Sequence, residues 1–538
     1  MPQMTGGEAI VATLQRHGVD TVFGLPGAQT YGIFDALHGA SNAIRTIGAR
    51  HEQGCGYMAF GYARSTGRPG VFSVVPGPGV LNASAAMLTA FGCNAPVLCL
   101  TGQVPSSFFG AGRGHLHEMR DQLATLRQLV KWADRIEHPA AAPGLVAEAF
   151  RQMLSGRQGP AALEMFWDQI TTTAEVDLVD PIAPAAPPPV DETRVAEAAK
   201  LIRAAKAPMI LIGGGAIDAG AEVLELANML EAPVIALRNG RGAISEADEL
   251  SLTIASGHPL WRETDLLIGI GSRLEIAGWR WDAPPSGLKR IRIDIDPAEA
   301  RRAPSDVDIL ADAAPATRAL IRAAAKAGAG SSGRREKILE TKAATERKTA
   351  GVRPQVDYLK VIREVLPDDG YFVDDLSQVS FASWFGFPVY RPRTYISSGY
   401  QGTLGSGFGT ALGVKAAHPD KPVISVCGDG GFMFAVQELA TAVQYGLAVT
   451  VIVFNNSSYG NVRRDQQTAF DGHVIGADLT NPDFVRLAES FGVGACRVEN
   501  PDALRPALEA ALAADAPRLI EVALEPGSEA SPWPFIRY

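Results

Sequence analysis

The fold of this chain is decided by residues 421–461, which read KPVISVCGDGGFMFAVQELATAVQYGLAVTVIVFNNSSYGN. An apolar, β-branched run at 423–426 stops at Gly428-Asp429-Gly430-Gly431, and apolar residues at helical spacing follow it. A second apolar run at 449–454 ends in Asn455-Asn456. The pattern predicts a strand–helix–strand unit whose two polar clusters lie at the carboxyl ends of adjacent parallel strands, where open α/β sheets bind ligands.

These two clusters have the chemistry of a site for a metal diphosphate. Asp429 is a hard oxygen ligand, and the side-chain carbonyl of Asn456 and the backbone carbonyl of Ser458 can join it around Mg²⁺. The glycines of the first cluster let N–H groups at a helix start approach phosphate oxygens. A tight turn with a capping aspartate would explain Gly-Asp-Gly alone, but it does not explain the asparagine pair after the next strand.

The segments GDGGF and NNSSYG resemble the thiamine diphosphate (ThDP) signature of the superfamily of acetolactate synthases, pyruvate oxidases and 2-oxo-acid decarboxylases. The resemblance implies ThDP and Mg²⁺ as cofactors, with Asp429, Asn456 and the Ser458 carbonyl as metal ligands. The cofactor-binding residues that it implies in this region are Gly428, Asp429, Gly430, Gly431, Asn456, Ser458, Tyr459 and Gly460.

Length and composition are those of an ordinary globular protein of several domains. The chain has 538 residues, of which 46% are hydrophobic and 20% charged, and its net charge is -9. Because the charge is negative and there is no long basic run, we expect no nucleic-acid partner. The five cysteines form no CxxC pair, and we find neither a charged-then-apolar leader nor an apolar span of membrane length. These features predict a cytoplasmic protein with no membrane partner.

Alternating strand and helix patterns predict an α/β protein with three doubly wound parallel-sheet domains. We place an N-terminal ThDP pyrimidine-binding domain at 1–175, a central α/β domain at 190–326 and a C-terminal domain for the ThDP diphosphate and Mg²⁺ at 353–525. The five prolines of 176–195 indicate an extended linker. A Gly/Ser stretch and a charged helix at 327–352 indicate a solvated connector.

Glu52 is the candidate catalytic residue of the N-terminal domain. It opens a helix, where a carboxylate is favoured by the helix dipole whatever its function. Within RHEQGCGYMAFGYAR, however, it resembles the glutamate of the superfamily that binds N1′ of the ThDP aminopyrimidine, so that the cofactor can form its own C2 ylid. In the same comparison Pro76, Gly77 and Asn82 line the pyrimidine side.

A second specific element is Gly402-Thr403-Leu404-Gly405. The resemblance implies that Leu404 is the bulky residue beneath ThDP that holds the cofactor in a bent shape, and that Gly402 offers its carbonyl to the 4′-amino group. Taken alone, Leu404 is only a core leucine. Ser377 and Gln378 would reach the diphosphate from a neighbouring loop.

Substrate specificity is harder to predict, because the chain departs from each familiar pattern. GQVPSSFFG at 102–110, DPAE at 296–299 and PDFVRLAESFG at 482–492 resemble acetolactate synthases. Those synthases carry a tryptophan shortly after the asparagine pair, where this chain places Asp465. Val462 stands where pyruvate decarboxylases have a glutamate.

The polar residues that remain for catalysis are Gln29, His115 and His117, with Arg463 or Arg464 as further candidates. The two histidines, two residues apart, are compatible with a metal site or with a surface loop that has no catalytic role. The ThDP context favours proton transfer near the carbanion over metal binding.

The central domain binds FAD in some members of the superfamily, and an adenine nucleotide in members that use CoA. FAD-carrying acetolactate synthases usually show an Arg-Phe-Asp-Asp type segment where this chain has SRLEI at 272–276. The loop Gly213-Gly214-Gly215 does not complete the GxGxxG pattern of dinucleotide sites. Both features argue against FAD and favour a structural central domain.

We therefore predict a ThDP- and Mg²⁺-dependent transferase or lyase that acts on a 2-oxo acid through a C2 ylid and an enamine. The first hypothesis is acetolactate synthase-like carboligation with an aldehyde or a second keto acid. The alternative is a non-oxidative decarboxylase that releases an aldehyde, with His115 or His117 as proton donor. A ThDP-binding subunit without turnover is the third, and intact Glu52, Asp429 and Asn456 argue against it.

Glu52 and Asp429 fall in different predicted domains, and the superfamily brings them together from two subunits. We expect a homodimer or homotetramer with active sites at the subunit interface. The tail GSEASPWPFIRY at 527–538 is compatible with a lid, a subunit contact or a docked tail.

Overall fold

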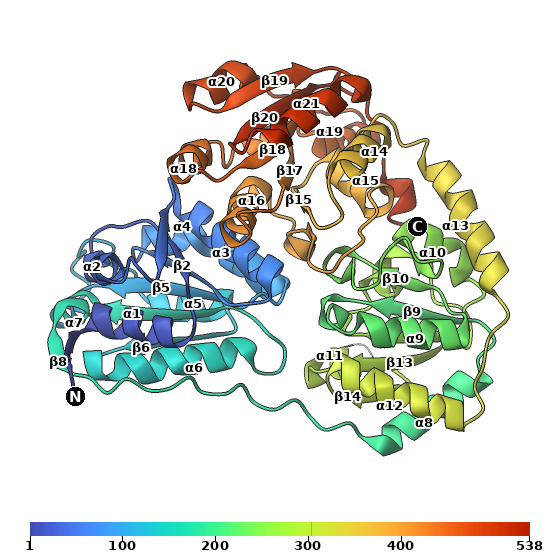
Figure 1. Ribbon diagram of the computed structural model, residues 1–538, viewed down its shortest axis with the longest axis horizontal. Coiled ribbons are helices and arrows are strands. Elements are labelled where there is room, and N and C mark those ends of the chain that lie inside the picture. The colour runs from blue at the N-terminus through green and yellow to red at the C-terminus, as the bar shows by residue number, and fades with distance from the viewer. Residues whose placement is uncertain (303) are drawn as a thin grey trace.

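The computed structural model describes residues 1–302 and 304–538. It contains three six-stranded sheets, each with helices on its faces, and a small antiparallel pair formed by β1 (Gln3–Thr5) and β8 (Thr173–Glu175) (Figure 1). All neighbouring strands within the three large sheets pair in parallel, as the strand–helix alternation predicts. The fold class is therefore confirmed.

The N-terminal sheet has the strand order β3-β2-β4-β5-β7-β6. The strands are β2 (Thr21–Gly24), β3 (Arg45–Gly48), β4 (Gly70–Val74), β5 (Val97–Gln103), β6 (Trp132–Ile136) and β7 (Ala161–Phe166). The helices are α1 (Gly6–Arg16), α2 (Tyr31–Gly39), α3 (Glu52–Thr66), α4 (Pro78–Gly92), α5 (Gln122–Leu129), α6 (Ala142–Leu154) and α7 (Trp167–Thr171). Because the chain turns back between β2 and β4, their carboxyl ends border the crevice in which such sheets bind ligands.

The C-terminal sheet repeats this connectivity in the order β16-β15-β17-β18-β20-β19. Its strands are β15 (Tyr371–Asp374), β16 (Tyr395–Ile396), β17 (Val423–Gly428), β18 (Val449–Asn455), β19 (Gly494–Val498) and β20 (Arg518–Ala523). Its helices are α14 (Gln355–Val365), α15 (Gln378–Gly386), α16 (Ser406–Ala417), α17 (Asp429–Phe432), α18 (Glu438–Tyr445), α19 (Gly460–Ala469), α20 (Phe484–Ser490) and α21 (Pro501–Ala513). The equivalent crevice lies between β15 and β17.

The stretch after Asp429 forms two short helices, α17 and α18, although its apolar spacing predicts a single helix. The chain turns between them at 433–437. In this turn Phe434 packs directly on Gly405, where a Cβ atom would clash with it. Tertiary packing has therefore overridden the local helical pattern.

The central sheet has the order β11-β10-β9-β12-β13-β14, which is the strand order of dinucleotide-binding folds. Its strands are β9 (Pro208–Ile212), β10 (Val234–Ala236), β11 (Ser251–Leu252), β12 (Leu266–Ile270), β13 (Lys289–Asp294) and β14 (Val307–Leu310). Its helices are α8 (Glu192–Ala204), α9 (Gly220–Leu230), α10 (Ile254–Trp261), α11 (Pro297–Arg302) and α12 (Ala313–Lys326).

The C-terminal sheet joins the other two through its helices (Figure 1). Buried residues of α16, α18 and α20 form one apolar core with those of α3, α4 and α5. Buried residues of α14, α15 and α21 continue the core of the central domain. Helices α3 and α16 approach closely, because a Cβ at Gly61 would clash with the Thr410 carbonyl and one at Gly413 with the Met58 carbonyl.

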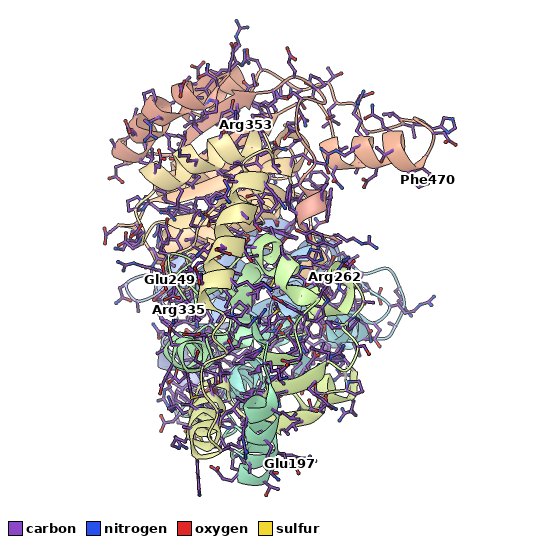
Figure 2. All side chains as sticks on the ribbon, turned by 90° about the vertical axis from the view of Figure 1, so that its right-hand side faces the viewer. Glu197, Glu249, Arg262, Arg335, Arg353 and Phe470 are labelled. Atoms are coloured by element: carbon purple, nitrogen blue, oxygen red, sulfur yellow. The ribbon has the colours of Figure 1, made fainter. Side chains whose placement is uncertain are left out.

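Two connectors link the domains. Residues 176–191 run without helix or strand along the lower edge of the molecule to α8, as the prolines predict (Figure 1). Helix α13 (Arg335–Thr349) leads back to the C-terminal domain, and Arg335 at its start pairs with Glu249 (Nη1–Oε2, 2.7 Å; Figure 2). Among the described residues, no helix is both long and apolar enough to cross a membrane.

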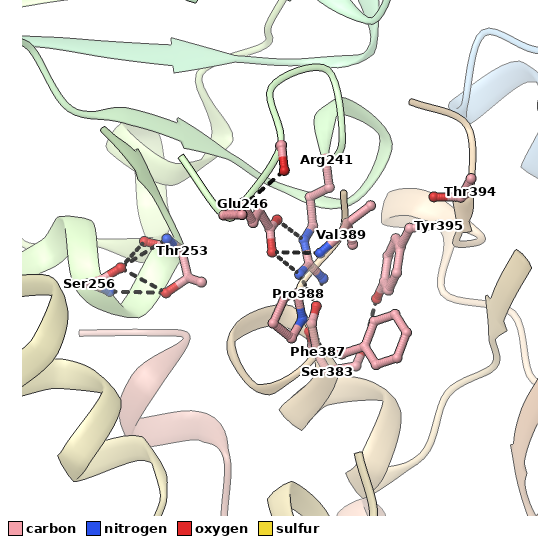
Figure 3. Close-up of polar contacts among 12 residues, drawn as sticks. Arg241, Glu246, Thr253, Ser256, Ser383, Phe387, Pro388, Val389, Thr394 and Tyr395 are labelled. Carbon is pink, nitrogen blue, oxygen red and sulfur yellow. Dashed lines mark hydrogen bonds and ion pairs between the residues drawn. The ribbon is translucent and has the colours of Figure 1, made fainter. Parts of the chain in front are cut away.

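A buried ion pair fastens the central domain to the C-terminal domain (Figure 3). Arg241 donates from Nε and Nη2 to the two carboxylate oxygens of Glu246, each at 2.7 Å, and the two side chains are 1% and 8% exposed. The same guanidinium donates to the backbone carbonyls of Ser383 (2.9 Å) and Phe387 (2.5 Å), which lie on and after α15. Arg241 therefore holds the helix that begins at the candidate diphosphate site.

Candidate functional site

The three predicted metal-binding residues lie together where β17 and β18 end side by side. Asn456 Oδ1 accepts hydrogen bonds from the backbone N–H (3.1 Å) and hydroxyl (3.0 Å) of Ser458. Burial raises the pKa of Asp429, although hydrogen bonds from Asn481 and from the N–H groups of Gly430 and Ser458 oppose the shift. Asp429, Asn456 and Ser458 thus form one group of oxygen donors, of the kind Mg²⁺ prefers.

The other predicted residues of this region surround that group. Gly430 lies against the ring of Tyr459, so that a Cβ would clash there, and a Cβ at Gly460 would be 2.8 Å from Asn456 Nδ2. Gly428 faces Ser377, with 3.3 Å between its ideal Cβ and the serine Cβ. The backbone at these three glycines therefore lies close to the side chains of Tyr459, Asn456 and Ser377.

Gln378, the first residue of α15, carries a free donor. Its Oε1 accepts a hydrogen bond from Arg464 Nη1 (2.8 Å), whereas its Nε2 is buried without a partner among the described residues. A buried donor without a partner is costly. A diphosphate oxygen would satisfy it, so the residues present fit an Mg²⁺-diphosphate group. Ser377 caps the same helix by accepting from the Ser380 N–H (3.1 Å).

Leu404 and Gly402 lie on the loop beside this group. An ideal Cβ at Gly431 would be 3.7 Å from Leu404 Cδ2, and one at Gly402 (φ 58°) would be 3.5 Å from Leu376. Asp375 fixes the loop by accepting the N–H groups of Leu376 (2.8 Å) and Gly405 (3.1 Å), and burial raises its pKa to about 6. Leu404 is half-buried, and the structure brings it next to the Gly430-Gly431 turn.

Two residues on the C-terminal-domain side of the site were not predicted from the sequence. Asn481 Nδ2 donates to Asp429 Oδ2 (2.7 Å) and to Asn455 Oδ1 (2.9 Å). Glu529, in the C-terminal tail, accepts from Asn456 Nδ2 (2.5 Å), and burial raises its pKa to about 7. Because the amide nitrogen of Asn456 faces Glu529, its oxygen is turned to the side of the predicted metal ligands.

The tail that carries Glu529 is docked along its length. Ala530 O accepts from Gln355 Nε2 (2.6 Å), and Trp533 Nε1 donates to Asn461 Oδ1 (2.5 Å). At its end, the ring of Tyr538 stacks on His258 of the central domain with 3.5 Å between centroids. In this structure the tail is a docked strap between two domains.

The N-terminal half of the predicted site centres on Glu52, the first residue of α3. Asn82 Nδ2 donates to Glu52 Oε2 (3.0 Å), and an ideal Cβ at Gly79 would be 3.5 Å from Glu52 Oε1. Asn82 is exposed and Glu52 half-buried, while Pro76 and Gly77 are buried at the end of β4. One carboxylate oxygen of Glu52, Oε2, is therefore held by Asn82, and no hydrogen bond to Oε1 occurs among the residues that the structure describes.

Gln29 and His117 form a second pair near Glu52. His117 Nδ1 and Gln29 Oε1 are 2.7 Å apart, and Gln29 Nε2 donates to the Leu116 carbonyl (2.6 Å). Both residues have left-handed backbone conformations, with φ of 63° and 69°, a kind of strain that concentrates at functional sites. Burial lowers the pKa of His117, and the charge of Glu52 opposes this shift.

The loop of His117 is anchored to Gly77, where a Cβ would be 2.6 Å from the His117 carbonyl. Gly77 N–H donates to Gln122 Oε1 (2.8 Å), a buried residue that sequence reasoning did not single out. No short motif marks Gln122, which begins an ordinary helix, so no signal in the sequence could have found it.

His115 lies in a different environment from His117. Its ring packs between Phe108 and Trp167, with centroid distances of 4.9 and 6.4 Å. Among the described residues no group of three or more His, Cys, Asp or Glu side chains is placed to hold a metal ion, so the two histidines are not part of such a group. The structure groups His117, but not His115, with Gln29.

A crevice of about 280 Å³ lies between the strand ends of the central domain and the N-terminal domain, and it is lined by the loops after β9 and β12 and by residues such as Arg64 and Arg157. Here Gly213 N–H donates to the Ile270 carbonyl (3.1 Å) and Gly215 N–H to the Gly271 carbonyl (3.1 Å). An ideal Cβ at Gly215 would be 2.9 Å from Gly271 Cα. The glycines are thus accounted for by the close packing of two loops.

Comparison with known proteins agrees with the three-domain architecture. Residues 4–125 match the family model described as thiamine pyrophosphate enzyme, N-terminal TPP binding domain. Residues 195–320 match the central domain of the thiamine pyrophosphate enzymes, and residues 375–522 their C-terminal TPP binding domain.

Similar proteins cover nearly the whole chain. A probable 2-ketoarginine decarboxylase, AruI of Pseudomonas aeruginosa, is 32% identical over 96% of this chain and 94% of its own length. An acetolactate synthase of Arthrospira platensis is 33% identical, with 97% and 94% covered. The large subunit of acetolactate synthase isozyme 1 of Escherichia coli is 31% identical, with the same coverage.

Proposed function

The chain belongs to the thiamine pyrophosphate enzyme family, and we propose that it joins a 2-oxo acid to a second carbonyl compound, as an acetolactate synthase does. Thiamine pyrophosphate is ThDP, so the enzyme is ThDP-dependent. The observation that carries the assignment is the group of Asp429, Asn456 and Ser458 at two adjacent strand ends. Relatives named acetolactate synthase support the carboligation.

We propose that Asp429, Asn456 Oδ1 and the Ser458 carbonyl hold Mg²⁺ against the ThDP diphosphate. The free Nε2 of Gln378 supports this assignment, because it supplies a donor for a diphosphate oxygen. Leu404 would support the cofactor between its rings, and the Gly402 carbonyl would accept from the 4′-amino group. When bound, ThDP supplies the nucleophilic carbon and the electron sink that decarboxylation of a 2-oxo acid requires.

On the pyrimidine side, Glu52 would exchange a proton with the N1′ nitrogen through Oε1, while Asn82 holds Oε2. Pro76 and Gly77 would border the ring. His117, held by Gln29, is the candidate for delivering or removing a proton at the substrate. We assign no such role to His115, because its ring is packed in the aromatic group of Phe108 and Trp167.

A decarboxylase that releases an aldehyde is the second candidate, because one relative is named a probable 2-ketoarginine decarboxylase. Proton NMR of products from pyruvate and from 2-ketoarginine, each with ThDP and Mg²⁺, distinguishes the two. We expect acetolactate from pyruvate. Acetaldehyde alone, or turnover of 2-ketoarginine alone, would replace the carboligase assignment with the decarboxylase.

We propose a homodimer, or a dimer of dimers, with Glu52 and Asp429 of one site supplied by different subunits. Large apolar side chains near both half-sites are exposed, including Leu81 (50%), Leu116 (55%) and Phe434 (50%). Phe470, 63% exposed, stands at the end of α19, which projects from the molecule (Figure 2). Exposed apolar groups of this size support a subunit contact.

Mixing two inactive variants tests this arrangement. Glu52→Gln and Asp429→Ala subunits, unfolded and refolded together, are expected to regain about a quarter of wild-type activity, because half of the random dimers contain one intact site. Each variant refolded alone is the control. No recovery in mixtures that form mixed dimers would show that both residues of a site come from one chain.

Glu529 is expected to orient Asn456 for the metal. Replacing it with alanine frees the Asn456 amide, and we expect the affinity for Mg²⁺ to fall about 10- to 100-fold, as for other residues that orient metal ligands. Calorimetric titration of Mg²⁺ in the presence of ThDP measures this. Glu525→Ala, in the exposed stretch just before the tail, is the matched control. Equal Mg²⁺ affinity in both variants would contradict the assignment.

We propose a structural role for the central domain and no bound FAD. The loop packing around Gly215 and Gly271 supports this, since it explains the glycines without a nucleotide. An absorption spectrum of the purified enzyme tests it, and flavin bands would contradict it. We also propose a cytoplasmic location, which the five free cysteines, four of them buried, support.

A further inference from the structure

Helix α18 of the C-terminal domain begins with a carboxylate that is completely buried. Glu438 is 0% exposed, and burial raises its pKa although several hydrogen bonds oppose the shift. Its oxygens accept the backbone N–H groups of His51 (3.0 Å) and Arg50 (3.2 Å to each oxygen) and the hydroxyl of Thr441 (2.6 Å). No ion pair to it occurs in the part of the chain that the structure describes.

The groups bound by Glu438 lie immediately before Glu52. His51 caps α3, with its ring Nδ1 accepting the Gln53 N–H (3.1 Å), and Glu52 is the next residue. Glu438 also occupies the space beside Gly54, where a Cβ would be 2.5 Å from its Oε1. The first turn of α3 therefore rests on this carboxylate.

The carboxyl end of α18 also forms hydrogen bonds with the segment of the N-terminal domain that precedes Glu52. Tyr445 Oη accepts the Gly48 N–H (2.9 Å), the Tyr445 carbonyl accepts Arg45 Nη2 (3.2 Å), and Gln444 Oε1 accepts Arg50 Nη2 (2.9 Å). These contacts hold residues 45–51, the strand and turn that lead into Glu52, at both ends of one short helix.

A purely structural contact at this place would not need a charge. Burying a carboxylate without a cationic partner costs free energy unless hydrogen bonds to its oxygens offset the loss of hydration. Here those hydrogen bonds come from N–H groups of the turn before Glu52, so the buried carboxyl group fixes the position of that turn. The pKa of the Cys55 thiol, raised first by burial and then by the charges of Glu438 and Glu52, reflects how near both carboxylates are.

We propose that Glu438 is a positioning residue that holds Glu52 in register with the cofactor, acting through the backbone of Arg50 and His51. This inference rests on the proposed function, in which Glu52 exchanges a proton with ThDP. The stretch that follows β17 then has two roles, one at each of its ends. Residues 428–431 contribute to the diphosphate site, and the helix that follows sets the catalytic carboxylate.

The test is the rate at which the C2 proton of bound ThDP exchanges with D₂O, followed by acid quench and NMR, together with calorimetric ThDP and Mg²⁺ affinities. In Glu438→Gln one acceptor oxygen becomes an NH₂ group that faces N–H donors. We expect exchange to slow about 10- to 100-fold, because small misplacements of a catalytic group have effects of this size, while both affinities stay within about twofold of wild type.

Three further variants separate positioning from stability. Thr441→Val removes one bond to Glu438 but keeps those to Arg50 and His51, so its exchange rate is expected near wild type. Gly54→Ala displaces the carboxylate from the opposite side and should slow exchange, which keeps the test open if Glu438→Gln fails to fold. In a Glu52→Gln background, Glu438→Gln is expected to slow exchange no further, because Glu438 acts through Glu52.

The outcomes distinguish this inference from the function on which it rests. Wild-type protein that binds ThDP without accelerating exchange would overturn both. Wild-type protein that accelerates exchange, with folded Glu438→Gln and Gly54→Ala exchanging as fast, would overturn the positioning role alone. Additive slowing in the double variant would also overturn it.

Discussion

Replacing Glu52 with glutamine is expected to lower turnover of a 2-oxo acid about 10²- to 10⁴-fold, the usual range for losing a positioned general acid–base group. Glutamine keeps the size of the side chain and can still accept from Asn82, but it cannot take up or release a proton at Oε1. ThDP and Mg²⁺ affinities, measured by calorimetry, should change little because the proposed metal ligands lie on the C-terminal domain.

The matched control for this variant is Glu192→Gln. Glu192 is also the first residue of a helix, α8, and it is exposed and remote from both half-sites. Its replacement removes the same charge from the same position in a helix, so it reports the effect of the helix dipole alone. Turnover by Glu52→Gln equal to that of Glu192→Gln would show that Glu52 only stabilises its helix.

The fold and the place where the candidate site residues come together could be predicted because their signals are local. The run before Asp429 and the run before Asn455 are mainly apolar strands that end in polar residues, and parallel pairing then puts both ends on one edge of the sheet. The conformation of α17 and α18 could not be predicted, because packing of Phe434 on Gly405 joins segments about thirty residues apart.

The supporting residues were missed for the same physical reason. Glu529 meets Asn456 across 73 residues of sequence, and Glu438 meets His51 across 387. Neither contact leaves a spacing pattern, since a buried carboxylate that accepts N–H groups looks in the sequence like any helix or tail glutamate. A motif thus marks the groups proposed to bind a ligand, while the residues that hold those groups in place are found only in the folded chain.

The ion pair of Arg241 and Glu246 makes the largest stability prediction. Arg241→Met leaves Glu246 buried without its cation, and breaking a buried pair in this way typically costs about 3–5 kcal/mol. The variant also loses the bonds to the Ser383 and Phe387 carbonyls, which hold the helix that starts at Gln378. We therefore expect a lower urea midpoint, followed by fluorescence, and weaker ThDP binding.

Two further variants show whether the loss comes from the unpaired charge. Arg262→Met removes an 83% exposed guanidinium that pairs with Asp282, and such a pair contributes about 0–1 kcal/mol. The double variant Arg241→Met/Glu246→Leu removes both buried charges and should recover much of the stability lost in Arg241→Met. If its ThDP affinity stays low while its urea midpoint recovers, the hydrogen bonds from Arg241 to the carbonyls of Ser383 and Phe387, and not the ion pair, set the position of α15. Recovery of both properties would instead assign that position to the packing of the two domains.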